Sequence, residues 1–160
     1  MNGLLFTLTL VAALGCGLNA GSLFAFSSFV MPALARVTPA VGVTAMQSMN
    51  KLAVTPAFMT ALFGTALVCV ATGGWALTDL GAPAAPYLLA GSALYLVGVI
   101  GLTAGFHQPR NLALGSVDPE GPDTPERWRR YVAQWSAWNH LRVVAGLAAA
   151  AAFTVAAVIG

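Results

Sequence analysis

Four long stretches of apolar residues dominate this 160-residue chain. They run from Leu4 to Leu34, Ala57 to Leu77, Ala84 to Phe106 and Val143 to Ile159. Each is close to or longer than the ~20 apolar residues that an α-helix needs to cross a hydrocarbon layer. Backbone polar groups in lipid must be satisfied within a helix or a closed barrel, and these runs far exceed the roughly ten-residue strands of a barrel. The pattern therefore predicts an all-α fold, a bundle of four transmembrane helices.

The composition agrees with this fold class. Charged residues make up 8% of the chain, against roughly a quarter in soluble domains. The net charge of +2 is too small to indicate a nucleic-acid partner. We therefore expect residues 1–160 to form a single integral membrane domain. The expected spans cover residues 4–34, 57–77, 84–106 and 126–159.

Two polar segments connect the expected spans. Thr38 is a suitable N-cap with Pro39 at the first helical position. Apolar residues then recur at helical spacing, which predicts an amphipathic helix over residues 39–54 that lies on the membrane surface or folds back onto the bundle. The segment that begins at His107 is expected to be a loop, before Thr124 restarts a helix that runs into the last span.

The positive charges indicate an orientation. All seven Lys and Arg residues fall between spans 1 and 2 or between span 3 and the apolar part of span 4. The remaining connection contains Asp79 and no cation. The positive-inside rule therefore places both basic segments in the cytoplasm and both termini outside, in what we expect to be a bacterial plasma membrane. Small residues on the outer helix faces would permit a homo-oligomer.

Polar residues lie at membrane depth in the last helix. One stripe, at about 100° per residue, contains Trp128, Tyr131, Trp135, Trp138, Asn139, Arg142 and Gly146. An interfacial aromatic belt explains its outer members, but Asn139 and Arg142 begin an unbroken apolar run. Polar residues at this depth usually face the bundle or a cavity and mark function. His140 lies about 150° around the helix from the stripe, so it is either a packing residue or a catalytic one.

Polar side chains from several segments could meet near the cytoplasmic end of the bundle. They are Asn19, Asn50, His107, Asn111, Asn139, His140 and Arg142. Beneath an aromatic rim, such a cluster would suit a planar, polar aromatic ligand; alternatively, the amides join helices through hydrogen bonds. Two histidines without a carboxylate inside a span make a poor metal site, so we predict no metal, although a haem held by His107 and His140 stays open.

Four motifs resemble the anthrone oxygenase family of small four-span membrane proteins. They are "GLNAGSLFAFSSFVMPAL" in the first span, "MQSMNKLAVTPAF" before the second, "PRNLAL" after the third and "WRRYVAQWSAWNHLR" entering the fourth. The resemblance covers nearly the whole chain, and "WxxWNHxR" is its most specific part. Characterised members are described as oxidising an anthrone to an anthraquinone with molecular oxygen and no evident cofactor.

The resemblance implies a cofactor-independent monooxygenase whose partners are an aromatic small molecule, O2 and the lipid bilayer. The positions that it carries over are Asn111, Trp135, Trp138, Asn139, His140 and Arg142, with Asn19 and Asn50 in matching segments. The chain departs from the family at His107 and Arg110, where an asparagine and an apolar residue are expected. Its substrate could therefore differ from the usual one.

A mechanism follows from this resemblance as a hypothesis. His140 or His107 would take a proton from an acidic C–H group of the substrate, which leaves a carbanion that reacts directly with O2. Arg142 and Asn139 would stabilise the oxyanion. The rings of Trp135 and Trp138 would stack on the substrate, and Asn19, Asn50 and Asn111 would complete its binding site.

Two other classes of function stay open. The first is a membrane protein without catalytic activity, whose polar cluster holds a lipid, a quinone or another membrane protein. The second is a metal or haem redox protein. Turnover of an anthrone would separate the oxygenase from the binding protein, and metal content with a visible spectrum would identify the redox protein.

Overall fold

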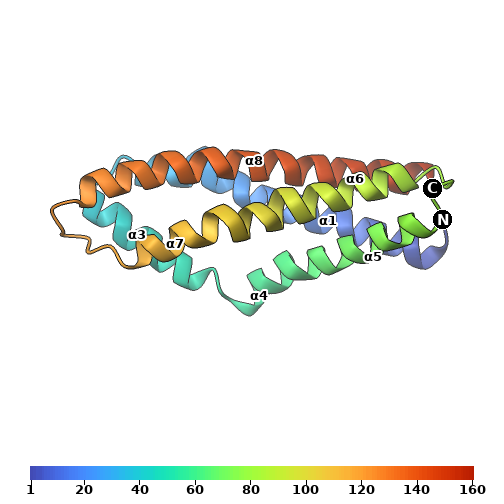
Figure 1. Cartoon of the computed structure of the whole chain (residues 1–160), viewed down its shortest axis with the longest axis horizontal. Coiled ribbons are helices and arrows are strands. Elements are labelled where there is room, and N and C mark those ends of the chain that lie inside the picture. Colours follow the sequence, from blue (N-terminus) through green and yellow to red (C-terminus); the bar gives the residue numbers. More distant parts are fainter.

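The computed structural model describes residues 1–160 as a bundle of helices that run side by side (Figure 1). Four helical segments are long and apolar enough to cross a membrane. They are Gly3–Leu34, Pro56–Thr78, Ala85–Gly115 and Thr124–Ile159. The all-α, four-span architecture predicted from the sequence is confirmed, and the chain is an integral membrane protein.

Three of the four spanning segments contain π-helical turns. The first consists of α1 (Gly3–Ala25), the π-helical stretch η1 (Phe26–Val30) and α2 (Met31–Leu34). The second consists of α4 (Pro56–Met59), η2 (Thr60–Gly64) and α5 (Thr65–Thr78). The third consists of α6 (Ala85–Tyr95), η3 (Leu96–Gly101), η4 (Thr103–His107) and α7 (Gln108–Gly115). The fourth is α8 (Thr124–Ile159), which is α-helical throughout.

The third segment is longer than the sequence predicts. It continues as a helix to Gly115, so the prediction that a loop begins at His107 was wrong. Pro109 does not end the helix, because it stands in the first turn of α7, directly after a π-helical stretch that already departs from the α-helical hydrogen-bond ladder. The side chain of Arg110 adds a hydrogen bond there, since its Nη1 donates to the carbonyl oxygen of Phe106 at 2.9 Å.

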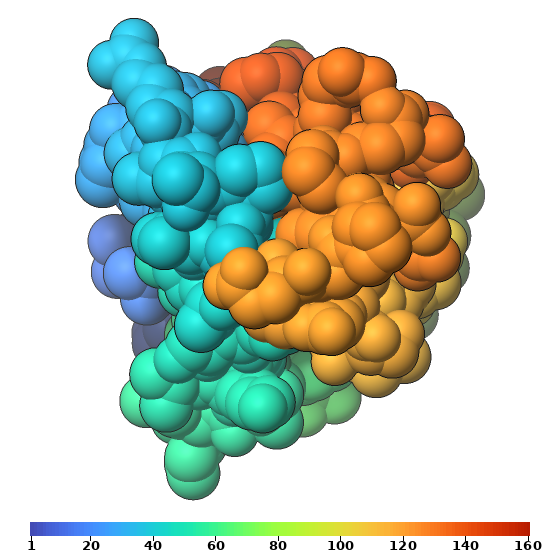
Figure 2. Space-filling view, turned by 90° about the vertical axis from the view of Figure 1, so that its left-hand side faces the viewer, coloured from blue at the N-terminus to red at the C-terminus, as the bar shows by residue number.

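The amphipathic helix α3 (Pro39–Leu52) folds back onto the bundle. Thr38 precedes it at the N-cap position in an extended conformation, as predicted, but its side chain makes no capping hydrogen bond. Gln47 Nε2 donates to the carbonyl oxygens of Leu114 and Val117, at 2.9 Å each, and thereby joins α3 to the end of α7. Figures 1 and 2 show α3 in turquoise beside the orange first part of α8. The helix therefore covers one end of the bundle.

The two ends of the bundle differ in charge. The N- and C-termini lie together at one end, where the Met1 ammonium donates to the carbonyl oxygen of Gly160 at 2.7 Å (Figure 1). The segments that contain every Lys and Arg residue except Arg142 lie toward the opposite end, together with α3, whereas Arg142 stands near the middle of α8. We call this opposite end the basic end. Between the two ends, small residues allow close packing of the helices: a Cβ at Gly146 of α8 would lie 3.0 Å from Ala20 of α1.

The packing of α3 on α8 yields a testable prediction. A Cβ at Gly42 would lie 2.6 Å from Cε2 of the buried Trp128 ring, so Gly42→Ala forces two helices apart. We expect this overpacking to cost about 1–3 kcal/mol and to lower the thermal denaturation midpoint of the purified protein in detergent.

Gly74→Ala is the matched control, because nothing lies within 4 Å of a Cβ at that position. We expect its midpoint to be unchanged or slightly raised, since alanine favours a helix over glycine. Equal midpoints for the two variants would contradict the described packing of α3.

Candidate active site

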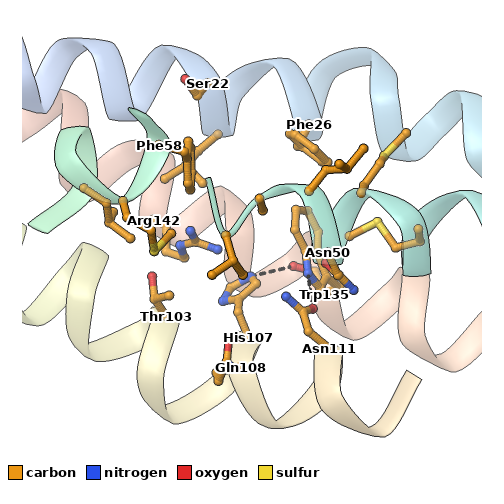
Figure 3. Close-up of a pocket in the computed structure, with 18 residues that line it drawn as sticks. Ser22, Phe26, Asn50, Phe58, Thr103, His107, Gln108, Asn111, Trp135 and Arg142 are labelled. Carbon is orange, nitrogen blue, oxygen red and sulfur yellow. Dashed lines mark hydrogen bonds between the residues drawn. The ribbon is translucent and has the colours of Figure 1, made fainter. Parts of the chain in front are cut away.

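A cavity of about 430 Å³ lies at the basic end, between the spanning segments and α3. Its walls are mostly apolar and aromatic, with side chains that include Phe26, Met46, Met49, Phe58, Met59 and Leu62. Its polar lining residues are Ser22, Asn50, Thr103, His107, Gln108, Asn111, Trp135 and Arg142 (Figure 3). An apolar cavity with a few convergent polar groups is the usual form of a small-molecule site.

The π-helical stretches contribute directly to this cavity. Phe26 comes from η1, Leu62 from η2, and Thr103 and His107 from η4. An extra residue in a helical turn rotates the side chains that follow it, and π-helical turns are frequent at functional sites for this reason. The first three spanning segments therefore change from α-helix to π-helix at the same level of the bundle as the cavity.

Arg142 is the charged residue of the cavity lining. Its side chain comes from α8 and is 6% exposed, yet no acidic residue pairs with it, because both ion pairs of the chain involve Glu126. Its Nε atom is buried without any hydrogen-bond partner. A buried guanidinium is costly when it is unpaired, and an anionic or strongly accepting oxygen of a ligand would offset that cost.

His107 lies beside Arg142 in the cavity and is 2% exposed (Figure 3). Its Nδ1 lies 3.3 Å from the carbonyl oxygen of Leu102, and its Nε2 lies 3.3 Å from that of Trp135. A neutral imidazole has one N–H group, so in either tautomer one ring nitrogen faces a carbonyl oxygen with its lone pair. A proton taken up there would form a second hydrogen bond to the backbone.

Amide groups gather at the other side of the cavity. Asn111 Oδ1 accepts from Tyr131 Oη at 2.8 Å and from Trp135 Nε1 at 3.1 Å. These two donors fix the orientation of the amide and leave its nitrogen as a donor without a protein acceptor. Asn50 Nδ2, from α3, is buried and also has no partner. Two free amide donors thus lie apart from Arg142, beside the Trp135 ring (Figure 3).

The connection between α3 and α4 forms both a wall of the cavity and part of the outer surface. Leu52 and Val54 line the cavity, although they are 68% and 71% exposed. Pro56 follows and begins the second spanning segment. The cavity therefore reaches the surface of the protein through an apolar segment next to a membrane span.

The structure brings together five of the nine predicted site residues. Asn50, His107, Asn111, Trp135 and Arg142 line the cavity.

The other four do not line the cavity. Asn19 joins helices instead, since its Nδ2 donates to the carbonyl oxygen of Ala61 at 3.1 Å. Asn139 Nδ2 donates to the carbonyl oxygen of Leu23 at 2.8 Å and to Ser27 Oγ at 2.8 Å. Trp138 stacks on Phe106, with ring centroids 3.8 Å apart.

His140 is exposed on the outer face of α8, so the structure does not bring it to the cluster or to His107. The reason is helical geometry, because His140 lies two residues before Arg142 and therefore points about 200° away from it. No group of three or more His, Cys, Asp or Glu side chains is arranged to hold a metal ion.

Sequence reasoning missed several residues of the lining. Phe58 and Met59 stand at the start of an apolar run, where no pattern separates a cavity wall from a lipid-facing position. Thr103 carried a weak signal as a hydroxyl residue inside an apolar run; its Oγ1 donates to the carbonyl oxygen of Val99 at 2.5 Å. Tyr131 lies outside the lining but orients Asn111, which is part of it. It stands on the predicted stripe, one turn before Trp135, and its hydrogen bond to Asn111 could not be predicted without the helical course of α7.

These features define a four-span integral membrane protein with a buried, arginine-containing aromatic cavity. Residues 51–152, well over half of the chain, match the protein family described as anthrone oxygenase. The chain belongs to the anthrone oxygenase family, as the sequence motifs predicted, and this membership indicates an oxygenase-type function in general terms. No curated protein and no solved structure matches the chain.

The unpaired charge of Arg142 yields a prediction about stability. Replacing it with methionine, a side chain of similar length, removes the cost of burying a cation without an anion. We expect Arg142→Met to raise the free energy of unfolding of the ligand-free protein by about 1 kcal/mol or more, measured by thermal denaturation in detergent.

Arg36→Met is the control, because Arg36 is exposed and its loss should leave the denaturation midpoint nearly unchanged. A lower midpoint for Arg142→Met than for the unsubstituted chain would show that the protein itself compensates the charge.

Proposed function

We propose that the chain is a membrane-embedded, cofactor-independent oxygenase that oxidises an anthrone-like or other electron-rich aromatic substrate with O2. The observation that supports this most directly is the buried, unpaired Arg142 in an aromatic cavity that also contains His107. Family membership supplies the reaction class. The cavity supplies a base, a cation and apolar walls, which are the three things that such a reaction needs.

The reaction balances without a further reactant. A methylene group flanked by two aromatic rings loses a proton to a base, and the resulting carbanion transfers electrons to O2 to form a C–O bond. The peroxide formed then loses water as the second C–H proton leaves. The methylene becomes a carbonyl group, one oxygen atom of O2 remains in the product, and the other leaves as water.

His107 is the proposed base. It lines the cavity, but both of its ring nitrogens face backbone carbonyl oxygens, so the ring must turn toward the cavity to take the proton from a substrate C–H group. A positioned base of this kind contributes about 10²–10⁴-fold to a rate. The family resemblance places an asparagine at this position, so we propose this base as a feature of the present chain.

Arg142 is the proposed counterion of the substrate anion. Proton transfer to His107 creates a second cation beside the guanidinium, and it creates an anion on the substrate at the same moment. The negative charge spreads onto the phenolic and carbonyl oxygens of the aromatic system. A fixed guanidinium in a mostly apolar cavity stabilises this charge strongly, because it needs no reorganisation.

The remaining polar groups orient the substrate. The charged edge of the aromatic system lies toward Arg142, and an oxygen at the opposite end accepts hydrogen bonds from Asn50 and Asn111. The Trp135 ring packs between these ends against Phe26, with centroids 5.7 Å apart, and against His107 at 5.1 Å. Aromatic pairs in such tilted and edge-on arrangements are favourable, so the Trp135 ring is held in place at the cavity wall.

We also propose the sidedness of the membrane protein. The positive-inside rule places the basic end, and therefore the cavity, on the cytoplasmic side and both termini outside. A hydrophobic aromatic substrate would then reach the cavity from the cytoplasmic leaflet.

Aerobic oxidation of a simple hydroxylated anthrone by the purified, detergent-solubilised protein tests the proposal. Quinone formation above the spontaneous rate, in the presence of a chelator and compared with boiled protein, would support it. Turnover that disappears with chelator would favour the metal redox protein, and a visible haem spectrum of the purified chain would favour the haem protein. Tight binding of the aromatic without turnover would favour the binding protein.

The choice between the two histidines is testable by substitution. We expect His107→Asn to lower kcat by about a hundredfold or more, because asparagine preserves hydrogen bonding but cannot accept a proton. His140→Asn is the matched control and should retain nearly the full rate, since His140 is exposed outside the cavity. The reverse result, a loss confined to His140→Asn, would move the base to the outer face of α8.

The orienting role of Asn50 is testable with a pair of substrates. We expect Asn50→Leu to lower kcat/KM by about tenfold or more for an anthrone with a hydroxyl group on the ring next to Asn50, because a buried hydrogen bond is lost. An anthrone without that hydroxyl should lose much less.

Met49→Leu, at a neighbouring apolar position of the lining, is the control and should affect both substrates equally little. An equal loss for both substrates with Asn50→Leu would indicate a structural role of Asn50 rather than recognition of the distal oxygen.

A further inference from the structure

A second, smaller hollow of about 170 Å³ lies between α7 and α8 at the basic end. It is lined by Arg110, Ala113, Leu114, Val117, Arg127, Arg130, Tyr131 and Gln134. Three of these residues are arginines and none is acidic. None of them lines the larger cavity, so the hollow is a separate feature of the molecule.

One of the three guanidinium groups is held in place by its neighbours. Arg110 Nε donates to Gln134 Oε1 at 3.2 Å, and its Nη1 donates to the Phe106 carbonyl oxygen at 2.9 Å. Its guanidinium carbon also lies 5.6 Å from the centre of the Phe106 ring. These contacts restrict the long side chain before any ligand arrives, so little conformational entropy is left to lose on binding.

The other two arginines have little or no compensation. The side chain of Arg127 makes no hydrogen bond and no ion pair, and only its backbone N–H donates, to the carbonyl oxygen of Asp123. Arg130 shares Glu126 with Arg129, in pairs whose side chains are more than half exposed and therefore contribute little. The hollow consequently has an excess of positive charge, which an anion with several oxygen atoms would neutralise.

The depth of the hollow matches that of lipid headgroups. Phe106 is the last residue of the third apolar run, and Arg110 lies one helical turn beyond it, about 6 Å along the axis. The headgroup layer on each side of a bilayer is roughly 5–8 Å thick. Leu112, beside the hollow on α7, is 66% exposed and offers an apolar surface to an acyl chain.

From these observations we infer that the hollow between α7 and α8 binds the phosphate group of an anionic phospholipid. Arg110 is the fixed ligand, and Arg127 and Arg130 close onto the phosphate oxygens from the first turns of α8. Basic pockets between spanning helices are a general means of binding anionic headgroups. The bound lipid would link α7 to α8 from outside, next to the Tyr131–Asn111 hydrogen bond.

Native mass spectrometry of the purified chain in detergent tests this inference. Phosphatidylglycerol and phosphatidylcholine with identical acyl chains serve as probes. We expect tighter binding of phosphatidylglycerol, and we expect the double variant Arg127→Gln, Arg130→Gln to lose on the order of tenfold in affinity for it. Both side chains are exposed, so the substitutions should leave the fold intact, which the denaturation midpoint verifies.

A charge-matched control separates the site from the overall charge. The double variant Arg36→Gln, Arg129→Gln removes the same charge at the same end from residues outside the hollow. We expect it to keep the affinity for phosphatidylglycerol. Equal losses for the two double variants, or no preference for the anionic lipid in the unsubstituted chain, would overturn the inference.

Inorganic phosphate distinguishes a lipid headgroup from a free anion. If millimolar phosphate displaces phosphatidylglycerol from the unsubstituted chain, the hollow recognises phosphate itself, and the assignment to a lipid fails. Retention of the lipid under these conditions supports the assignment, because the acyl chains then contribute to binding.

Discussion

A guanidinium group between membrane-spanning helices must be stabilised by the protein or by whatever the protein binds. Arg142 occupies such a position at the start of the last apolar run, and no acidic residue accompanies it. The structure around Arg142 fits this need to stabilise a buried cation. The π-helical turns widen three segments around the charge, aromatic side chains form the walls, and α3 covers the end of the bundle. The site thus keeps a cation in an apolar cavity without a permanent partner.

The sequence predicted the fold and five of the 18 residues that line the cavity, for identifiable reasons. Four uncharged apolar runs leave few alternatives to a helical bundle, because lipid offers no partner for backbone polar groups. The stripe on α8 was also informative, since this helix is regular from Thr124 onward. Ideal geometry therefore placed Trp135 and Arg142 on one face and His140 on another, and the structure agrees.

The parts that the sequence did not predict depend on irregular helices and on partners distant in the chain. The polar segment after the third run suggested a loop, yet π-helical turns before Pro109 carry His107 into the cavity. Nor did the sequence separate two kinds of buried amide. Asn19 and Asn139 join α1 to neighbouring helices, whereas Asn50 keeps a free donor in the cavity. The two roles differ only in whether a backbone carbonyl oxygen of another helix lies within hydrogen-bond distance of the amide nitrogen, and the sequence does not show this.

The position of Leu52 and Val54 has a consequence for any ligand of the cavity. These residues line the cavity and are also exposed on the outer surface of the protein, next to the start of a membrane span. If the proposed substrate enters the cavity beside these residues, it would arrive from the bilayer by lateral diffusion without passing through water. Its occupancy then follows its mole fraction in the lipid rather than its concentration in the sample. Adding empty vesicles would lower the occupancy at a constant total amount of ligand, a form of dilution that soluble binding sites do not show.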